Sequence, residues 1–247
     1  MLEMNIVSDD VGAAAHTGTA VGRAIELWHR GVEVNDALRQ VKAESPGGDG
    51  RDPFLDYNED EVQTMFRRYA SDPRNDRGIH NVPVNSLEAE VDFELPPHPL
   101  NTTRQPIRIT GHLDQIRIPA GLAAQVWDVK SGKSGGDQML ADYAFQIAAY
   151  TVGAHKAGTW GNVMPGGIIR LRGYMGRAAE KLAQGEHPVF FRYGMQYQHA
   201  MLLMEEVSLR VALMRTGEVC AKPGRFCSFC PSGGLDFCLQ RLSEMAE

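Results

Sequence analysis

Three short stretches, Gly111-His112-Leu113-Asp114, Asp128-Val129-Lys130 and Gln146-x-x-x-Tyr150, decide the fold of this chain of 247 residues. The first two lie within apolar-rich runs bounded by turn residues, which is the pattern of β-strands. The third lies in a proline-free segment rich in Ala, Leu and Ile, which predicts a helix. The expected order is therefore strand, strand, helix, with polar side chains in each.

The two predicted strands bring acidic side chains close together. They cover about 107–118 and 122–129, and the short 119–121 connection predicts a hairpin that sets Asp114 beside Asp128. Asp128 and Lys130 alternate with Val129 and so project to the same face. The alternative is a surface hairpin with alternating charges, because Asp-x-Lys alone is a common pattern.

The predicted helix covers about 137–155 and holds Gln146 and Tyr150 on one face at i, i+4 spacing. A Gln–Tyr pair inside the core would explain the same spacing. Beside two acids and a lysine, however, the pair favours a site for phosphodiester hydrolysis. Two acids can hold a divalent cation, which neutralises phosphate charge and lowers the pKa of a bound water. A lysine adds positive charge near that water.

In this order the three motifs resemble the RecB-like branch of the PD-(D/E)xK nuclease superfamily. That branch includes the nuclease domains of bacterial recombination helicase-nucleases and the Cas4 exonucleases. The resemblance implies an α/β, restriction-endonuclease-like core, in which helices flank a central mixed β-sheet. It also implies a nuclease-like domain over 1–217, with a helical insert at 31–80, and a Cys-rich C-terminal lobe over 218–247.

The resemblance assigns catalytic roles to the strand residues. Asp114 and Asp128 would ligate Mg²⁺ or Mn²⁺, together with the backbone carbonyl of Val129. Lys130 would orient or activate the water that attacks the phosphodiester.

Further residues complete the implied site. Relatives place one more acid upstream, and Glu90 takes that position better than Glu88. Gln146 and Tyr150 would contact the DNA strand near the scissile phosphate. Lys133, in the Ser- and Gly-rich turn that follows the second strand, is a further candidate for phosphate contact.

One family motif is incomplete in this chain. Relatives often carry Gly-Thr-x-x-His in an early helix, and that histidine joins the metal ligands. Here Gly18-Thr19 is followed at the histidine position by Gly22. His16, just before the motif, and Glu26, one turn after it, are the candidate replacements. A histidine at a helix start is more often a cap or a surface residue, so the sequence leaves this ligand open.

A second cluster lies near the C-terminus, where all the cysteines occur. A Cys-x-x-Cys flanked by two further cysteines can close a tetrahedral sulfur site. No leader peptide is expected, so the compartment is predicted to be reducing and a metal is favoured over disulfides, with buried free thiols as the alternative. The resemblance favours a [4Fe–4S] cluster, whereas spacing alone allows Zn²⁺ equally, and either would act as a structural staple. The four ligands would be Cys220, Cys227, Cys230 and Cys238.

Composition limits the function classes. The chain is 43% apolar, which is enough for one sizeable core, and it has no apolar run of the roughly 20 residues that a membrane span needs. A soluble, cytoplasmic protein of a bacterium or a phage-infected cell, without membrane contact, is therefore expected. The net charge of −6 disfavours a broad nucleic-acid surface, so phosphate contacts would fall to a local basic rim. The candidates for that rim, which could equally be scattered solvated charges, are Arg104, Arg108, Arg117, Arg170, Arg172, Arg177 and Lys181.

The sequence supports three functions. The leading one is a metal-dependent DNA nuclease, an exonuclease acting on single-stranded or duplex ends in recombination, repair or phage DNA processing. The second is a catalytically weakened relative that binds DNA. The third is a metal-stapled module that recruits a helicase or recombinase partner. Outside the motifs, helices are predicted over about 11–30, 59–70 and 197–215, and a strand over 167–174.

Overall fold

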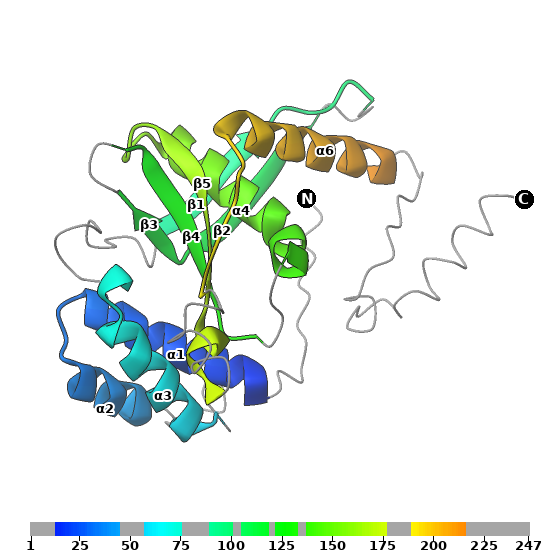
Figure 1. Ribbon diagram of the computed structural model, residues 1–247. Helices are drawn as coiled ribbons and strands as arrows, with labels where there is room; N and C mark the ends of the chain where they lie inside the picture. The colour runs from blue at the N-terminus through cyan, green and yellow to red at the C-terminus, as the bar shows by residue number, and fades with distance from the viewer. Residues whose placement is uncertain are drawn as a thin grey trace, which may run out of the picture. The chain divides into compact units, whose positions relative to one another are not determined.

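A computed structural model describes residues 13–44, 57–75, 89–100, 105–118, 122–132, 137–176 and 189–215 (Figure 1). The chain divides into two compact units, of which the larger holds Gly12–Phe93 and Ile109–Met204. Its elements, with those that continue into the smaller unit, are α1 (Ala13–His29), α2 (Val34–Glu44), α3 (Glu59–Ser71), η1 (Pro73–Asn75), β1 (Ala89–Leu95), β2 (Ile107–Leu113), β3 (Gln115–Arg117), β4 (Ala124–Lys130), α4 (Asp137–Ala157), β5 (Val163–Arg170), η2 (Leu171–Tyr174), β6 (Phe190–Arg192) and α6 (Tyr197–Arg215).

The smaller unit, where it is described, holds the end of β1, the start of β2 and the later part of α6. Within it the Ser208 hydroxyl donates to the carbonyl of Pro96 at 3.0 Å. None of the helices in the described part of the chain is both long enough and apolar enough to span a membrane.

The central sheet of the larger unit is mixed. Its strand order is β3-β4-β5-β6, and β1 pairs with β2 in a separate two-stranded sheet. Strands β3 and β4 are antiparallel with Gln115 opposite Trp127, and β4 and β5 are parallel with Lys130 opposite Arg170. The parallel pair needs a crossover, which α4 supplies. This is the mixed α/β arrangement that the sequence predicts.

The two faces of the sheet are covered by different helices. Trp127 on β4 and Ile169 on β5 belong to a hydrophobic core shared with α1, α2 and α3, which Figure 1 shows as a group of adjacent helices in blue to cyan. Helix α4 packs against β4 and β5 and buries Ile147 and Val152. Because side chains alternate along a strand, residues next to each other on β4 face different helices.

Helix α3 begins with a strong N-terminal signal. The side chain of Asn58 accepts a hydrogen bond from the backbone N–H of Glu61 at 3.1 Å, which caps the helix. Glu59, Asp60 and Glu61 fill the first turn, where the helix dipole favours negative charge. The helix predicted over 59–70 is therefore present, as are those predicted over 11–30, 137–155 and 197–215.

Three details differ from the sequence prediction. The strand expected over 107–118 is interrupted at Asp114, so that β2 and β3 enter different sheets. The strand expected over 167–174 begins earlier, at Val163, and gives way to a 3₁₀ turn after Arg170. Helix α2 was not predicted, because only Ala37 and Val41 of this short, polar segment are buried. The Cys-rich lobe predicted over 218–247 lies outside the described residues.

Candidate active site

The break between β2 and β3 brings the two aspartates together. Asp114 lies at that break, and its Oδ2 accepts a hydrogen bond from the backbone N–H of Val129 at 2.8 Å. Lys130 lies on the same face of β4 as Asp128, and its Nζ is 2.8 Å from Asp128 Oδ2. The structure thus gathers the two acids and the lysine, as the strand spacing predicts.

The carboxyl group of Asp128 receives fewer hydrogen bonds than its two oxygens can accept. It is fully buried, and its Oδ1 accepts one hydrogen bond, from Gln146 Nε2 at 3.2 Å. Its Oδ2 is also buried and has no partner with hydrogen-bond geometry, although the Lys130 ammonium is close enough to pair with it. Burial, reinforced by the Asp114 carboxylate and opposed by Lys130, raises the pKa of Asp128 to about 8. A metal cation bound at Oδ2 would, together with Lys130, offset the effects of burial and of the Asp114 carboxylate and favour the ionised form of Asp128.

Lys130 keeps its charge in this setting. Burial by itself lowers the pKa of an ammonium, but the carboxylates of Asp128 and Asp114 outweigh it and leave the pKa of Lys130 raised. Its Nζ also lies over the ring of Tyr143, 4.7 Å from the centroid, in a cation–π contact. Sequence reasoning missed Tyr143, yet its place three residues before Gln146 put it on the same face of the helix.

The Gln–Tyr pair of α4 faces the aspartates. Gln146 Nε2 donates to the Tyr150 hydroxyl at 2.9 Å as well as to Asp128. Burial raises the pKa of Tyr150, so its hydroxyl keeps its proton at neutral pH. A Cβ on Gly111 would lie 2.8 Å from Cε1 of the Tyr150 ring. The glycine of the first motif is therefore needed where the tyrosine of the third motif packs.

The carboxylate oxygens at this site are ligands that suit a hard divalent cation. Mg²⁺ is typically bound by one or two carboxylates and keeps several waters, so it does not need a cage made entirely by protein. Asp114 and Asp128 supply two carboxylates, and Asp128 Oδ2 is a buried acceptor without a hydrogen-bond donor. In the described part of the chain, no group of three or more His, Cys, Asp or Glu side chains is placed so that it could hold a metal ion.

The candidate replacements for the motif histidine do not join the two aspartates in such a cluster. His16 lies in α1, and its Nδ1 is buried without a hydrogen-bond partner. Glu26 pairs instead with Arg23 at 2.7 Å and with Arg30 at 2.8 Å. The position of Gly22 is open, because a Cβ there would meet nothing within 4 Å.

Several predicted site residues are not described. Glu90 lies on β1, but its side chain is outside the described set. Glu88 and Lys133 lie outside the described residues altogether. The same holds for the predicted sulfur ligands Cys220, Cys227, Cys230 and Cys238.

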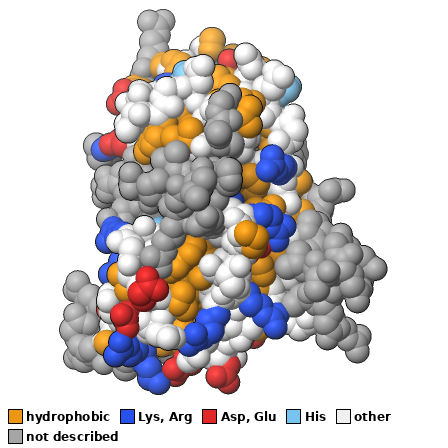
Figure 2. Space-filling view, turned by 60° about the vertical axis from the view of Figure 1, so that its left-hand side comes forward, with side chains coloured by type: hydrophobic (Ala, Val, Ile, Leu, Met, Phe, Trp, Pro, Cys, Tyr) orange, Lys and Arg blue, Asp and Glu red, His pale blue; other side chains and the backbone are white. Residues whose placement is uncertain are grey.

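Two arginines of the predicted basic rim make internal contacts instead. Arg117 is 6% exposed, and its guanidinium lies over the rings of Trp127 and Phe190. Arg172 forms a bidentate pair with Glu61. On the face that Figure 2 shows, basic side chains are interspersed with acidic and apolar ones.

A family model described as the PD-(D/E)XK nuclease superfamily matches residues 3–234. The chain belongs to the PD-(D/E)XK nuclease superfamily. The match covers the two aspartates, Lys130 and the Gln–Tyr pair, and the mixed sheet flanked by helices is consistent with the restriction-endonuclease-like fold. Membership makes a metal-dependent nuclease, a hydrolase that usually uses Mg²⁺ or Mn²⁺, the general function of this chain. No curated protein matches it.

Proposed function

We propose that this member of the superfamily is a deoxyribonuclease of the RecB-like and Cas4-like branch, and that it acts as an exonuclease on DNA ends. The observation that carries this proposal is the buried Asp128 carboxylate, with Asp114 and Lys130 against it and one oxygen without a donor. Recombination, repair and phage DNA processing are the settings in which such an activity is needed.

Each side chain has a distinct role in this proposal. Asp114, Asp128 and the Val129 carbonyl hold the divalent cation, which when bound supplies charge neutralisation and lowers the pKa of a water. The raised pKa of Lys130 keeps it an ammonium at neutral pH, so it stabilises negative charge at the phosphate rather than removing a proton.

The helix residues position the substrate. Tyr150 presents a protonated hydroxyl, and the Gln146 amide lies between that hydroxyl and Asp128. Both groups suit contact with phosphate or sugar oxygens, which fixes a strand without reading its sequence. Glu90 on β1 is the proposed third acidic ligand, and Lys133 the proposed phosphate contact after β4.

The deciding experiment is cleavage of end-labelled, linear single-stranded DNA by anaerobically purified protein with Mn²⁺. We expect Lys130→Ala to lower the cleavage rate by about 100- to 1000-fold, because it removes charge stabilisation at the reacting phosphate. Lys42→Ala is the matched control, since Lys42 lies on α2 and pairs with Glu59. Undiminished cleavage by Lys130→Ala would refute the assignment.

A second candidate function is a weakened relative that binds DNA or recruits a partner. It is favoured by Gly22 in place of a histidine ligand, and by the lack, among the described residues, of a group of three or more His, Cys, Asp or Glu side chains that could hold a metal ion. It predicts retained DNA binding without cleavage in both the natural protein and Lys130→Ala.

The Cys-rich lobe is proposed to bind a [4Fe–4S] cluster, or else Zn²⁺, through Cys220, Cys227, Cys230 and Cys238 as a structural staple. Iron, acid-labile sulfide and zinc analysis of the purified protein separates the two. If the lobe recruits a helicase or recombinase, Cys227→Ser abolishes that association and Asp128→Ala leaves it intact. Equal loss from both changes would contradict recruitment by the lobe.

A further inference from the structure

Residues 57–75, which carry none of the nuclease motifs, contact the side chains of Gln115, Arg117 and Arg172. Helix α3 and the turn after it pack on the face of the sheet opposite to α4. The side chains that alternate with the catalytic ones along β3 and β4 therefore point toward α3. These are Gln115, which follows Asp114, and Trp127, which precedes Asp128.

The start of α3 holds the end of β4. Glu61, in the first turn, binds both terminal nitrogens of Arg172, at 2.8 and 2.6 Å. The Nε of the same Arg172 donates to the backbone carbonyl of Ser131 at 3.1 Å. Ser131 directly follows Lys130, so one planar guanidinium links α3 to the backbone beside the catalytic lysine.

Helix α1 also lies close to Ser131. A Cβ on Gly18 would lie 2.6 Å from the Ser131 hydroxyl oxygen, so the two segments are as close as a glycine permits. Thr17, next to it and buried, accepts a hydrogen bond from the backbone N–H of Asn58, the N-cap of α3, at 3.1 Å. Ser131 thus lies close to α1 and to Arg172, the arginine that Glu61 of α3 binds.

The end of α3 holds β3. The buried amide of Gln115 donates to the Tyr69 hydroxyl through a short hydrogen bond, and the His29 ring lies 2.9 Å from the same hydroxyl. Arg117 donates to the side-chain Oε1 of Gln115 at 3.1 Å and to the side-chain Oδ1 of Asn75 at 2.6 Å. Gln115 directly follows Asp114, so this network fixes the backbone beside the first aspartate.

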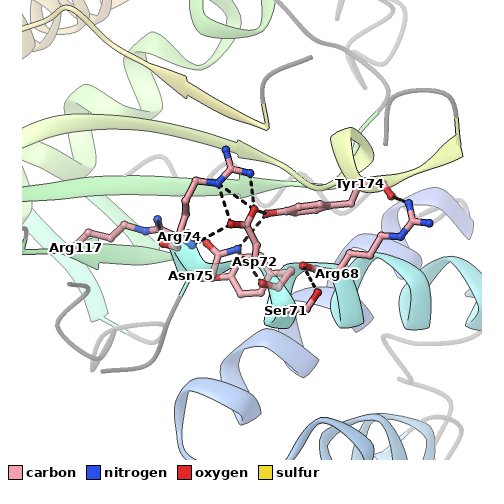
Figure 3. Close-up of polar contacts among 8 residues, drawn as sticks. Arg68, Ser71, Asp72, Arg74, Asn75, Arg117 and Tyr174 are labelled. Carbon is pink, nitrogen blue, oxygen red and sulfur yellow. Dashed lines mark hydrogen bonds and ion pairs between the residues drawn. The ribbon is translucent and has the colours of Figure 1, made fainter. Parts of the chain in front are cut away.

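A polar cluster at the end of α3 surrounds Asn75, which binds Arg117 (Figure 3). Asn75 donates to the Tyr69 carbonyl at 3.0 Å and to the Tyr174 hydroxyl at 3.1 Å. The Tyr174 hydroxyl in turn donates to Asp72 at 2.6 Å. The contacts join residues that are far apart in sequence, so the end of α3 is tied to Tyr174 and, through Asn75, to Arg117 of β3.

We propose that α3 is a positioning element of the metal site. Glu61, acting through Arg172, and Tyr69, acting through Gln115, set where Lys130 and Asp114 stand relative to Asp128. The inference rests on the proposed function, because it concerns the affinity of that same site for a divalent cation. Outer contacts that orient metal ligands typically contribute 10- to 100-fold to metal affinity or activity.

The test compares two glutamates in the first turn of α3. Glu61→Gln removes the bidentate pair with Arg172, and Glu59→Gln removes the exposed ion pair with Lys42, 3.0 Å long. Mn²⁺ affinity is measured on the full chain, without DNA, from the electron paramagnetic resonance signal of free Mn²⁺, beside the melting temperature. We expect Glu61→Gln to weaken Mn²⁺ binding about tenfold, and Glu59→Gln to leave it within about twofold.

A kinetic readout separates positioning from general stability. Excess Mn²⁺ should restore kcat in Glu61→Gln while the KM for DNA stays near that of the natural chain, because the groups proposed to contact DNA are untouched. Arg172→Lys serves as the milder variant if Glu61→Gln fails to fold, since one ammonium cannot bind both Glu61 oxygens and the Ser131 carbonyl at once. Tyr69→Phe removes the hydroxyl that Gln115 binds and tests the contact between α3 and β3 in the same way.

The outcomes are distinct. If Glu61→Gln and Glu59→Gln bind Mn²⁺ equally well and differ only in melting temperature, α3 is a structural element and the inference is overturned, while the proposed function stands. If the folded natural chain binds no Mn²⁺, the proposed function fails and the inference falls with it.

Discussion

Two buried or nearly buried aspartates, Asp72 and Asp128, show how one side chain serves structure and another suits a reaction site. Asp72 accepts hydrogen bonds from the backbone N–H and guanidinium of Arg74 and from the Tyr174 hydroxyl. Asp128 accepts one, from Gln146, and has an oxygen with none. Both side chains are buried, and they differ in the number of hydrogen bonds that their carboxyl oxygens accept.

The titration of the two acids reflects the same difference. At Asp72 burial alone would raise the pKa, but hydrogen bonds from Arg74 and Tyr174 outweigh it and lower the pKa. At Asp128 burial and the nearby Asp114 carboxylate raise the pKa to about 8. A carboxylate left short of donors by its own fold is one that a metal can satisfy.

The largest expected effect is on cleavage by Asp128→Asn. The amide cannot replace the carboxylate as a metal ligand, so we expect a loss of about 1000-fold or more in Mn²⁺-dependent cleavage of end-labelled DNA. In EDTA at about pH 7, the free energy of unfolding should not fall below that of the natural chain, because the amide is neutral in both states whereas the buried Asp128 carboxyl holds a proton that it loses on unfolding. A large loss of stability would show that Asp128 is a structural acid like Asp72.

The matching change at the other acid should act on stability. We expect Asp72→Asn to lower the free energy of unfolding by about 2 kcal/mol, because it removes the charge that Arg74 and Tyr174 bind and leaves donors facing an amide. Urea denaturation in EDTA at about pH 7 measures the change, with Asp128→Asn as the reference. Equal destabilisation by the two substitutions would break the comparison.

The pH dependence of stability should differ in sign between the two sites. The folded Asp128 keeps a proton until about pH 8, whereas an unfolded aspartate loses it near about pH 3.9. Between these values the folded state binds more protons, so the Asp128 contribution to the free energy of unfolding falls as pH rises, by up to about 1.4 kcal/mol per pH unit. The lowered pKa of Asp72 gives a contribution present above about pH 3.9 that is lost as pH falls below it.

Urea titrations in EDTA between about pH 5 and 8 test whether the contribution of Asp128 to the free energy of unfolding falls as pH rises. Relative to Asp128→Asn, the natural chain should lose stability as pH rises. A difference that stays flat across this range would mean that Asp128 is ionised throughout.

Divalent metal should reverse that loss. Binding requires the ionised carboxylate, so protons compete with the metal. We expect Mn²⁺ to raise the melting temperature more at about pH 8 than at about pH 6, and to leave Asp128→Asn unchanged. Stabilisation of the natural chain and of Asp128→Asn to the same extent would place the metal elsewhere.

The short motifs predicted how these side chains are arranged, because the spacing within each element is local. Strand alternation placed Asp128 and Lys130 on one face, the hairpin placed Asp114 opposite, and helical spacing paired Gln146 with Tyr150. The catalytic and metal-binding roles of these residues stay predictions.

The contacts of α3 could not be predicted in this way. Arg172 meets Glu61 across 111 positions of sequence, and Asn75 meets Tyr174 across 99. A periodic pattern shows which face of an element is buried, but not which distant side chain meets it. For this reason Arg117 and Arg172 were candidates for a basic rim, whereas the structure buries Arg117 and pairs Arg172 with Glu61.

The smallest expected effect tests the packing of one motif on another at Gly111. A methyl group there would lie 2.8 Å from the Tyr150 ring, which is half-buried and can shift, so we expect Gly111→Ala to destabilise the chain by only about 1 kcal/mol. Cleavage should fall further, by about tenfold, because displacing Tyr150 removes the partner 2.9 Å from Gln146 and misplaces the groups around Asp128. Gly22→Ala is the control, since its Cβ meets nothing within 4 Å and a helical alanine should raise stability by up to about 1 kcal/mol.

A double-mutant cycle decides whether Gly111 acts through the tyrosine. If it does, Gly111→Ala adds no further loss of cleavage in a Tyr150→Ala background, because the ring that the methyl group would displace is gone. If the two losses multiply, the glycine serves β2 for another reason.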